Sequence, residues 1–387
     1  MRTLHPLINT QEFLSLSALF NYQLSGEPVS WRGILKLMLG DQAERPAPEL
    51  LLEALAYLEE AYGTQKRRLG PLAVLHPIRA AALLARAEDA PAALDLLTTL
   101  FHDKDEDLTP DRYSPENWQQ LERTYQALAA RSGAGAAELE ERLGYLTRNS
   151  SERYHQYLGR LLDGATRQPA LIKIKLADRL DNTLDLRIDL SDYTDTLDFY
   201  EVVFEILFVQ TYHGIDLKQQ PHPVGRKING AMRLYQLYKN AVFLSLLRDE
   251  QVALDSAAKS LFTSLALASI AEAQSTMLHI FAYHLRDRQE QQDLLRSVVS
   301  YSEAGGLQHI NLGEGHHLDG LFKRRFDRES KSERQESLEK LYADKRLMGE
   351  TAVAFIVIFI NFLNDPEFTI KGISAQGIVP TPVSTPV

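Results

Sequence analysis

The 387-residue chain contains no cysteine. This absence excludes a disulfide framework, a thiolate-ligated zinc or iron–sulfur site, and a cysteine nucleophile. Any metal ion must therefore be held by His, Asp or Glu side chains.

An excess of positive charge is lacking as well. Lys and Arg number 42 against 52 Asp and Glu, which gives a formal charge of -10. Such a surface repels nucleic-acid phosphates and anionic lipids, so we expect neither a general nucleic-acid binder nor a membrane-surface protein. Apolar residues make up 44% of the chain, enough to bury a sizeable core.

Long apolar runs are also missing. Residues 1–16 show neither an apolar segment behind basic residues nor a small-residue cleavage site, so we expect no signal peptide and a cytoplasmic protein. The most apolar run, residues 351–363, falls short of the roughly 20 residues that a spanning helix needs. It predicts a buried core helix.

Strand signals are scarce, whereas apolar residues three and four apart recur, which predicts an all-α fold. Gly, Pro and polar residues cluster at 219–225, where we place a domain boundary. We expect an N-terminal helical extension (1–45), a helical domain (46–218), a C-terminal helical domain of unknown role (219–371) and a disordered tail (372–387). The predicted helices cover residues 48–62, 78–86, 92–102, 154–162, 227–248 and 254–286.

Two segments of the C-terminal region are unusual in composition. Residues 304–320 are rich in Gly and His, and His309, His316 and His317 suggest either a second metal site or simply a loop. Residues 323–340 are highly charged and predict a solvated helix face.

The segment HDKDED, residues 102–107, follows an apolar stretch and is expected to continue its helix. At about 100° per residue, Lys104 and Asp105 fall to the solvent side. Polar groups directly after a buried stretch are costly to desolvate unless a cation compensates them, and His beside Asp suits manganese, iron, magnesium or zinc. The alternative is a helix end whose acidic residues are solvated. The residues that share the other face are His102, Asp103, Glu106 and Asp107.

Two further fragments carry candidate ligands. In LIKIKLADRLDNTLDLR, residues 171–187, Asp178 and Asn182 stand four apart and share a helix face. His76 precedes Pro77, and proline suits the first helical position, so His76 is expected at a helix start with its ring free to face a site. Each fragment alone is more often a cap or a surface ion pair.

Together and in this order, a His, a His-Asp pair and a distant Asp resemble the signature of the HD-domain metal-dependent phosphohydrolases. HDKDED is similar to the HD-x-x-ED motif of the RelA/SpoT-type hydrolases, which act on the alarmone (p)ppGpp, and IKLADRLDN is similar to their IKLADRxHN segment. Arg67, in the basic loop QKRRLGPLAVLHP, stands nine residues before the first His, as in that family. The resemblance spans roughly residues 51–214 and includes no synthetase domain.

The resemblance implies an HD-domain helical fold, one divalent ion such as Mn²⁺, and hydrolytic removal of the 3′-pyrophosphate of (p)ppGpp to give GDP or GTP. It implies that Glu106 and Asp107 orient or deprotonate the attacking water. It implies that Arg67 and Arg68 hold the nucleotide and that Asn182 contacts it. The metal ligands that it implies are His76, His102, Asp103 and Asp178.

Several positions depart from the family pattern. An aromatic residue beside the metal site is missing, since the chain has Leu72 and Ala73 there. Asp181 replaces a His, and Asp185 replaces a hydroxyl residue. Extra negative charge near a phosphate-rich ligand would lower its affinity or change which ligand fits.

Three functions remain open at this point. The first is a manganese-dependent alarmone hydrolase with an added helical domain, acting on a small-molecule nucleotide. The second keeps the metal site but acts on another nucleotide or phosphoester, and the third is a noncatalytic alarmone-binding regulator. The helices after residue 225 match no nucleotide-transfer motif and are expected to form a dimerisation layer, a regulatory module or a lid.

Overall fold

The computed structural model describes residues 5–40, 47–67, 72–132, 135–149, 151–188, 194, 197–212, 215 and 228–378. In this part of the chain nearly all regular structure is helical, and a two-stranded hairpin is the one sheet among these residues, which confirms the all-α fold class. Contacts divide the chain into two compact units. The first unit comprises Met1–Glu152, Arg160–Asp185 and Ala253–Leu265, and the second comprises Arg153–Gly159, Leu186–Val252 and Ala266–Val387.

This division differs from the domain limits expected from the sequence. The N-terminal residues belong to the first unit rather than forming an extension. The chain enters the second unit first at Arg153–Gly159 and again at Leu186, well before residue 219. The expected boundary at 219–225 lies outside the described residues. Loop composition marks where the chain leaves a helix, whereas a unit is set by which apolar faces pack together.

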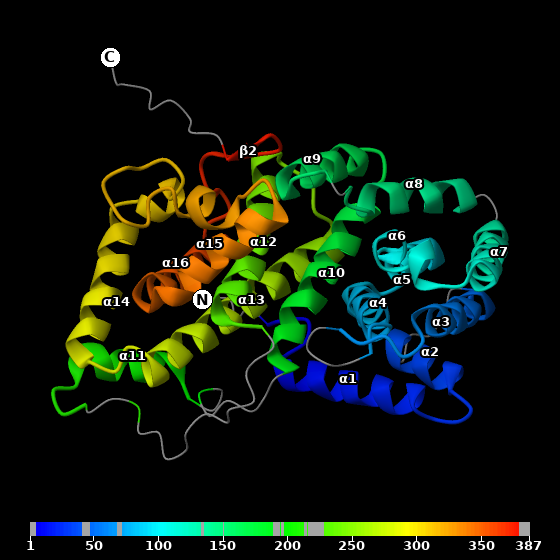
Figure 1. Ribbon diagram of the computed structural model, residues 1–387, viewed down its shortest axis with the longest axis horizontal. Coiled ribbons are helices and arrows are strands. Elements are labelled where there is room, and N and C mark those ends of the chain that lie inside the picture. Colours follow the sequence, from blue (N-terminus) through cyan, green and yellow to red (C-terminus); the bar gives the residue numbers. More distant parts are fainter. Residues whose placement is uncertain are drawn as a thin grey trace. The chain divides into compact units, whose positions relative to one another are not determined.

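Helix α4 (Leu75–Ala87) lies at the centre of the first unit, where it packs against α1, α2, α5 and α10 (Figure 1). All of its residues from Leu75 to Ala85 are buried, and its run of alanines lets the neighbouring helices approach closely. The other helices with residues in this unit are α1 (Thr10–Leu24), α2 (Trp31–Leu39), α3 (Pro48–Tyr62), α5 (Ala93–Phe101), α6 (Lys104–Asp107), η1 (Pro110–Arg112), α7 (Pro115–Arg131), α8 (Ala136–Leu146), α9 (Tyr154–Ala165), α10 (Ala170–Asp185) and α13 (Ser256–Tyr283).

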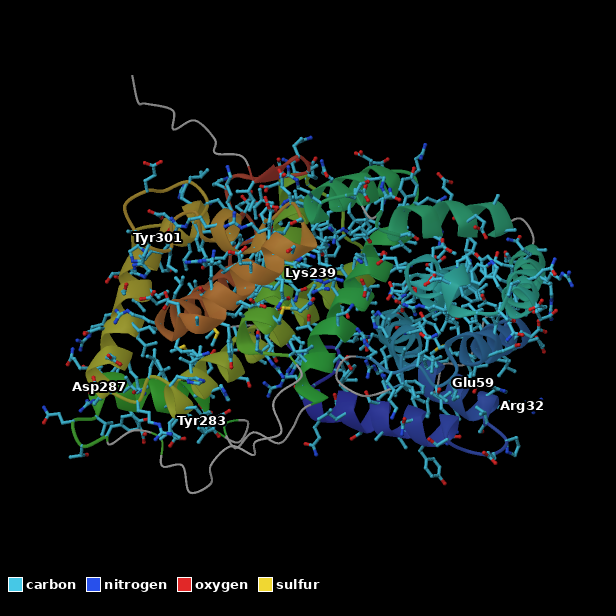
Figure 2. The ribbon with its side chains drawn as sticks, viewed as in Figure 1. Arg32, Glu59, Lys239, Tyr283, Asp287 and Tyr301 are labelled. Atoms are coloured by element: carbon cyan, nitrogen blue, oxygen red, sulfur yellow. The ribbon has the colours of Figure 1, made fainter. Side chains whose placement is uncertain are left out.

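Helix α16 (Lys345–Asn364) packs against α12 and α14 in the second unit. Side chains fill the space between these helices in Figure 2, where Asp287 is labelled at the N-cap of α14, accepting a hydrogen bond from the backbone of Glu290. The remaining elements of this unit are η3 (Leu186–Ile188), α11 (Phe199–Phe208), α12 (Gly230–Asp249), α14 (Arg288–Glu303), η5 (Gly306–His309), the π-helix η6 (Phe322–Phe326), α15 (Lys331–Ala343), β1 (Ile373–Ser374) and β2 (Gly377–Ile378).

Two helices, α13 and α16, have the length and apolar composition of a membrane span. Most of their apolar windows are nevertheless buried within the protein, 72% in α13 and 67% in α16. Such burial is typical of core helices in a soluble protein. The predicted core helix over residues 351–363 therefore lies within α16, as expected.

The predicted disordered tail is wrong for its first residues. Strands β1 and β2 pair in antiparallel register, Ile373 opposite Ile378, and both isoleucines are buried. Because Ile373 and Ile378 stand opposite each other across the hairpin, their side chains lie on the same face of it. Residues 379–387 lie outside the described part of the chain.

The charged stretch 323–340 is not one continuous helix face. It divides between the π-helix η6 and α15. Phe326, the last residue of η6, is buried against Tyr238 and Phe355, so η6 ends in the core of the unit. Ser330 then starts α15 through a capping box with Glu333.

The His-rich segment 304–320 is a packed loop rather than an open one, since Leu307, Ile310 and Leu318 are buried. Its three histidines each contact a different partner. They are His309 with the Gly305 carbonyl, His316 with Ser297, and His317 with Glu350.

Candidate metal centre

His76 is held at the second position of α4, because the helix begins at Leu75 rather than at Pro77 as predicted. Pro77 is tolerated there because the amides of the first helical turn have no partner within the helix. The His76 side chain is buried, and its Nδ1 lies 2.6 Å from Asp181 Oδ2. This contact leaves His76 Nε2 as the atom that faces the other candidate ligands.

The HDKDED segment bends at its first two residues instead of continuing α5. Helix α5 ends at Phe101, a turn follows, and Asp103 becomes the N-cap residue of the short helix α6. His102 Nδ1 lies 2.7 Å from the carbonyl oxygen of Thr99, which can only accept, so Nδ1 is the donor. The neutral His102 ring therefore presents Nε2 as a lone pair, the form that binds a metal ion.

The predicted ligand atoms converge around His76 Nε2. That atom lies 3.2 Å from His102 Nε2, 3.1 Å from Asp103 Oδ2 and 3.3 Å from Asp178 Oδ1. His102 Nε2 in turn lies 3.2 Å from Asp103 Oδ1 and 3.6 Å from Asp178 Oδ1. Four residues from α4, the α5–α6 turn and α10 thus direct their donor atoms toward one point. Three of them form a group with the spacing of a metal site, namely His76, His102 and Asp103.

The acidic surroundings raise the pKa of both histidines. Burial and the charge of Arg67 act to lower the pKa of His76, but hydrogen bonds to carboxylates outweigh them and hold it well above its usual value. Burial likewise opposes the charged form of His102, whose pKa is raised by the neighbouring carboxylates. The carboxylates concerned are Asp103, Asp178 and Asp181.

The carboxylates show the opposite shift. Burial acts to raise the pKa of Asp103, yet the two histidines hold it well below its usual range. The pKa of Asp178 is also held low, by Lys175 and then by the histidines. Without a metal ion, protons on the imidazoles compensate the buried carboxylates. Two imidazole nitrogens and two carboxylates are a donor set suited to manganese, iron, magnesium or zinc, so these residues fit a divalent ion that would displace those protons.

Asp181 and Asp185, the departures from the family pattern, both pair with an arginine that the sequence analysis did not single out. Arg79 is fully buried in α4 and donates from Nε and Nη2 to Asp181, at 2.8 and 3.1 Å, and from Nη2 to Asp185 at 2.7 Å. Its spacing offered a signal, since Arg79 lies three residues after His76 and so shares its helix face. Asp181 thus orients the His76 ring from behind, the usual role of a carboxylate behind a metal-binding His.

Arg67 lies at the edge of this cluster, with its side chain 24% exposed. Its Nη2 donates to Asn182 Oδ1 at 2.7 Å, and its Nε lies 3.5 Å from Asp185. Asn182 also donates to Asp178 Oδ1 at 2.5 Å, so it links the arginine to a candidate metal ligand. Arg68, the second predicted nucleotide contact, lies outside the described residues.

Glu106 and Asp107 project from α6 toward different partners. Asp107 accepts a hydrogen bond from Tyr62 at 3.0 Å, and Glu106 accepts one from the backbone of Arg148 at 2.7 Å. Desolvation of each carboxyl raises its pKa, and the negative charge of Asp103 adds to the rise in both. A carboxyl with a raised pKa is better suited to exchange a proton near neutral pH.

Lys104 is not solvent-facing as predicted. It is buried, its Nζ lies 4.2 Å above the Tyr125 ring centroid, and it contacts Asp105 and Glu122. The turn at residues 102–103 rotates α6 relative to α5, so a single helical wheel drawn through both places Lys104 wrongly. Asp105 is exposed, as expected.

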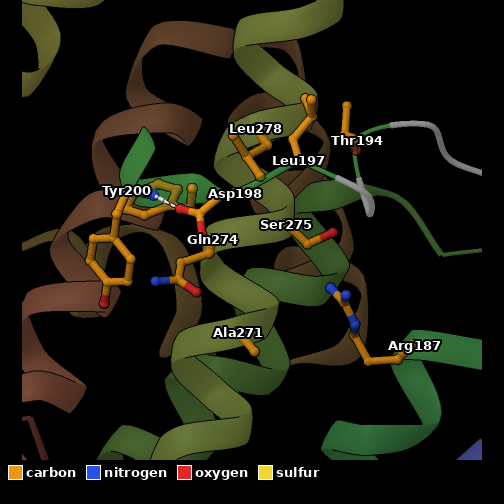
Figure 3. Close-up of a pocket in the computed structure, with 10 residues that line it drawn as sticks. Arg187, Thr194, Leu197, Asp198, Tyr200, Ala271, Gln274, Ser275 and Leu278 are labelled. Carbon is orange, nitrogen blue, oxygen red and sulfur yellow. Dashed lines mark hydrogen bonds between the residues drawn. The ribbon is translucent and has the colours of Figure 1, made fainter. Parts of the chain in front are cut away.

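A cavity of about 260 Å³ lies in the second unit between α11 and α13 (Figure 3). Arg187 extends toward Ser275 in this view, and Asp198 accepts a hydrogen bond from the Tyr200 amide. The Arg187 guanidinium lies 3.9 Å from buried Glu272. The residues lining this cavity include no His and a single carboxylate, Asp198, so it lacks the donors of the centre in the first unit.

No family model matches this chain, no curated protein matches it, and no solved structure matches it.

Proposed function

We propose that the protein is a metal-dependent phosphohydrolase that removes the 3′-pyrophosphate of (p)ppGpp. The observation that carries this proposal is the convergence of His102, Asp103 and Asp178 on His76 Nε2, all within 3.3 Å. These residues come from three separate segments in the order of the HD-domain motif. A bare helix end with solvated carboxylates, the alternative considered from sequence, does not require such convergence.

His76, His102, Asp103 and Asp178 would hold one divalent ion, manganese by analogy with the family. The ion would lower the pKa of a water molecule and offset the charge that builds on the phosphoryl oxygens. Asp181 and Arg79 keep the His76 ring in the orientation that binds.

Asp107 and Glu106 would accept and transfer the proton of the attacking water. Both lie in the short helix that follows Asp103, and both have a raised pKa. Tyr62 fixes the Asp107 carboxylate through one oxygen and leaves the other able to accept a proton. Glu106 has an exposed side chain and can pass that proton to solvent.

Arg67 and Arg68 would bind the anionic nucleotide. Arg67 Nη1 is buried without a hydrogen-bond partner in the described structure and lies 3.7 Å from Asp181, so a movement of the side chain would be needed to bring this donor to a phosphate oxygen. Asn182 holds the same guanidinium and would contact the nucleotide beside it. Since Arg79 and Arg67 both pair with Asp181 and Asp185, these two acidic departures need not repel the ligand. We place the enzyme in the cytoplasm, where such nucleotides occur.

The decisive experiment incubates the purified full chain with ppGpp and Mn²⁺ and identifies the products. We expect GDP and pyrophosphate in equal amounts, with magnesium a poorer activator than manganese. Release of orthophosphate, or turnover of another phosphoester but not of ppGpp, would favour the second function, a hydrolase with a different substrate. Tight ppGpp binding without turnover in any metal would favour a noncatalytic alarmone-binding regulator.

A further inference from the structure

The second unit contains a pocket that the proposed hydrolysis does not use. Its volume is about 460 Å³, within the usual range for small-molecule sites. It is formed where the π-helix η6 meets the N-terminal half of α16. The residues that line it are His317, Arg324, Arg325, Asp344, Arg346, Leu347 and Glu350.

Positive charge prevails in this pocket, although the chain carries a net charge of -10. Three guanidiniums face two carboxylates, and both carboxylates are already engaged. Asp344 accepts from the Leu347 amide as the N-cap of α16. Glu350 is buried and lies 2.6 Å from His317 and 3.3 Å from Arg346.

Arg324 and Arg325 have no carboxylate partner among the described residues. Arg324 donates to the backbone carbonyl of His317 at 2.7 Å, and Arg325 makes neither a hydrogen bond nor an ion pair within that part of the chain. Two adjacent guanidiniums without counter-charge repel each other, so the arrangement is stabilised when an anion lies between them.

The backbone holds these arginines in a fixed place. Phe322 and Phe326, which bound the π-helix, are buried against Tyr238 and Phe355, with ring centroids 5.1 to 6.1 Å apart. Ser337 of α15 donates to the Arg324 carbonyl. π-Helical turns are rare and occur often at functional sites. The anchored aromatics hold the backbone of Arg324 and Arg325 in place, so binding has only their side chains to order.

We propose that this pocket binds a multiply charged phosphate anion, of the diphosphate type found free or on a small phosphorylated metabolite. Planar guanidiniums bind phosphate oxygens through paired hydrogen bonds, which favours a phosphate over a monovalent anion. His317, with its side chain 46% exposed, lies at the rim, where its ring contacts Glu350. The site is separate from the metal centre and the inference stands whether or not the proposed function is correct.

Calorimetric titration of the full chain with inorganic pyrophosphate in EDTA tests the proposal, because chelation prevents binding through a metal ion. We expect saturable binding that Arg325→Ala and Arg324→Ala each weaken about tenfold or more. Lys323→Ala removes the same charge from a neighbouring exposed position that does not line the pocket, and should weaken binding less than about twofold. Arg67→Ala, in the other unit, should leave this affinity unchanged.

Absence of saturable pyrophosphate binding would overturn the proposal. Equal losses in Lys323→Ala and Arg325→Ala would also overturn it, since only general electrostatics would then be at work. Loss of binding in Arg67→Ala alone would assign the anion to the first unit and contradict a site in the second. Adding GDP as a second probe distinguishes the sources of the phosphate: tighter binding than pyrophosphate indicates a nucleotide, and equal or weaker binding indicates the free anion.

Discussion

Each unit contains a buried histidine with one ring nitrogen held by an aspartate, and the two nitrogen–oxygen distances are nearly equal. His76 Nδ1 lies 2.6 Å from Asp181 in the first unit, and His155 Nε2 lies 2.7 Å from Asp327 in the second. Both histidines are almost completely buried. The difference lies at the second ring nitrogen. His76 Nε2 faces a histidine and two carboxylates, whereas His155 Nδ1 is buried without a hydrogen-bond partner in the described structure.

This comparison shows what separates a candidate metal centre from a structural ion pair. A carboxylate on one nitrogen fixes the ring in either unit, but only convergence of further donors on the other nitrogen creates a place for a cation. In the second unit the pair serves packing instead, since Asp327 also accepts a hydrogen bond from the backbone of Ile378 in the terminal hairpin.

The largest effect is expected from removing candidate ligands in the first unit, compared with breaking the His155–Asp327 pair in the second. Asp178→Ala and His102→Ala should reduce bound manganese to background and abolish hydrolysis, because each removes one of four ligands. Asp327→Ala deletes the carboxylate that pairs with His155 in the second unit and should leave metal stoichiometry unchanged. Elemental analysis of the dialysed proteins measures both. Full metal occupancy in Asp178→Ala and His102→Ala would refute the ligand assignment.

The next effect concerns the chemical step. Glu106→Gln and Asp107→Asn should lower kcat by about 10²- to 10⁴-fold, the usual contribution of a positioned acid or base. Bound manganese should stay near the level of the unaltered protein, because neither carboxylate contacts His76 or His102. Initial rates at saturating substrate and metal analysis check both statements. A variant with full activity removes that residue from the mechanism.

A smaller effect is expected at the edge of the site. If Arg67 binds the substrate as proposed, Arg67→Ala should raise KM about tenfold and lower kcat less, because the contact would form in the ground state as well. Lys66→Ala is the matched control, since it removes a neighbouring exposed charge and should change KM less than about twofold. Arg68→Ala belongs in the same series. A fall in kcat with unchanged KM would place Arg67 in the chemical step instead.

Asp327→Asn is expected to leave turnover at saturating metal unchanged. Its effect should be on the stability of the fold alone. His155 lowers the pKa of Asp327, so this carboxylate stabilises the fold above its unfolded pKa of about 4, and the contribution is lost as pH falls through the lower folded value. Urea unfolding should show the variant about 2 kcal/mol less stable at pH 7, with the difference shrinking below about pH 4. A difference that stays constant across this range would show that the ionised carboxylate makes no contribution.

The local sequence determined most helices and the identity of the candidate ligands. The apolar spacing of residues 48–62 predicted α3 with its observed ends, and the long helices α12 and α13 lie where periodicity placed them. The resemblance to the HD-domain motif indicated His76, His102, Asp103 and Asp178, whose donor atoms the structure brings together. Helical periodicity depends on neighbouring residues, and a motif is matched along the chain, so both can be detected without knowing the packing.

Only the tertiary structure decided how charges are compensated and which helices belong together. Arg79, inconspicuous in an Ala-rich helix, pairs with Asp181 and Asp185 because α10 packs against α4. Lys104 is buried because the chain turns at residues 102–103, and the terminal hairpin is ordered because it packs on α12. These outcomes depend on side chains distant in sequence, and the free energy of a buried charge is set by its partners in space rather than by its neighbours along the chain.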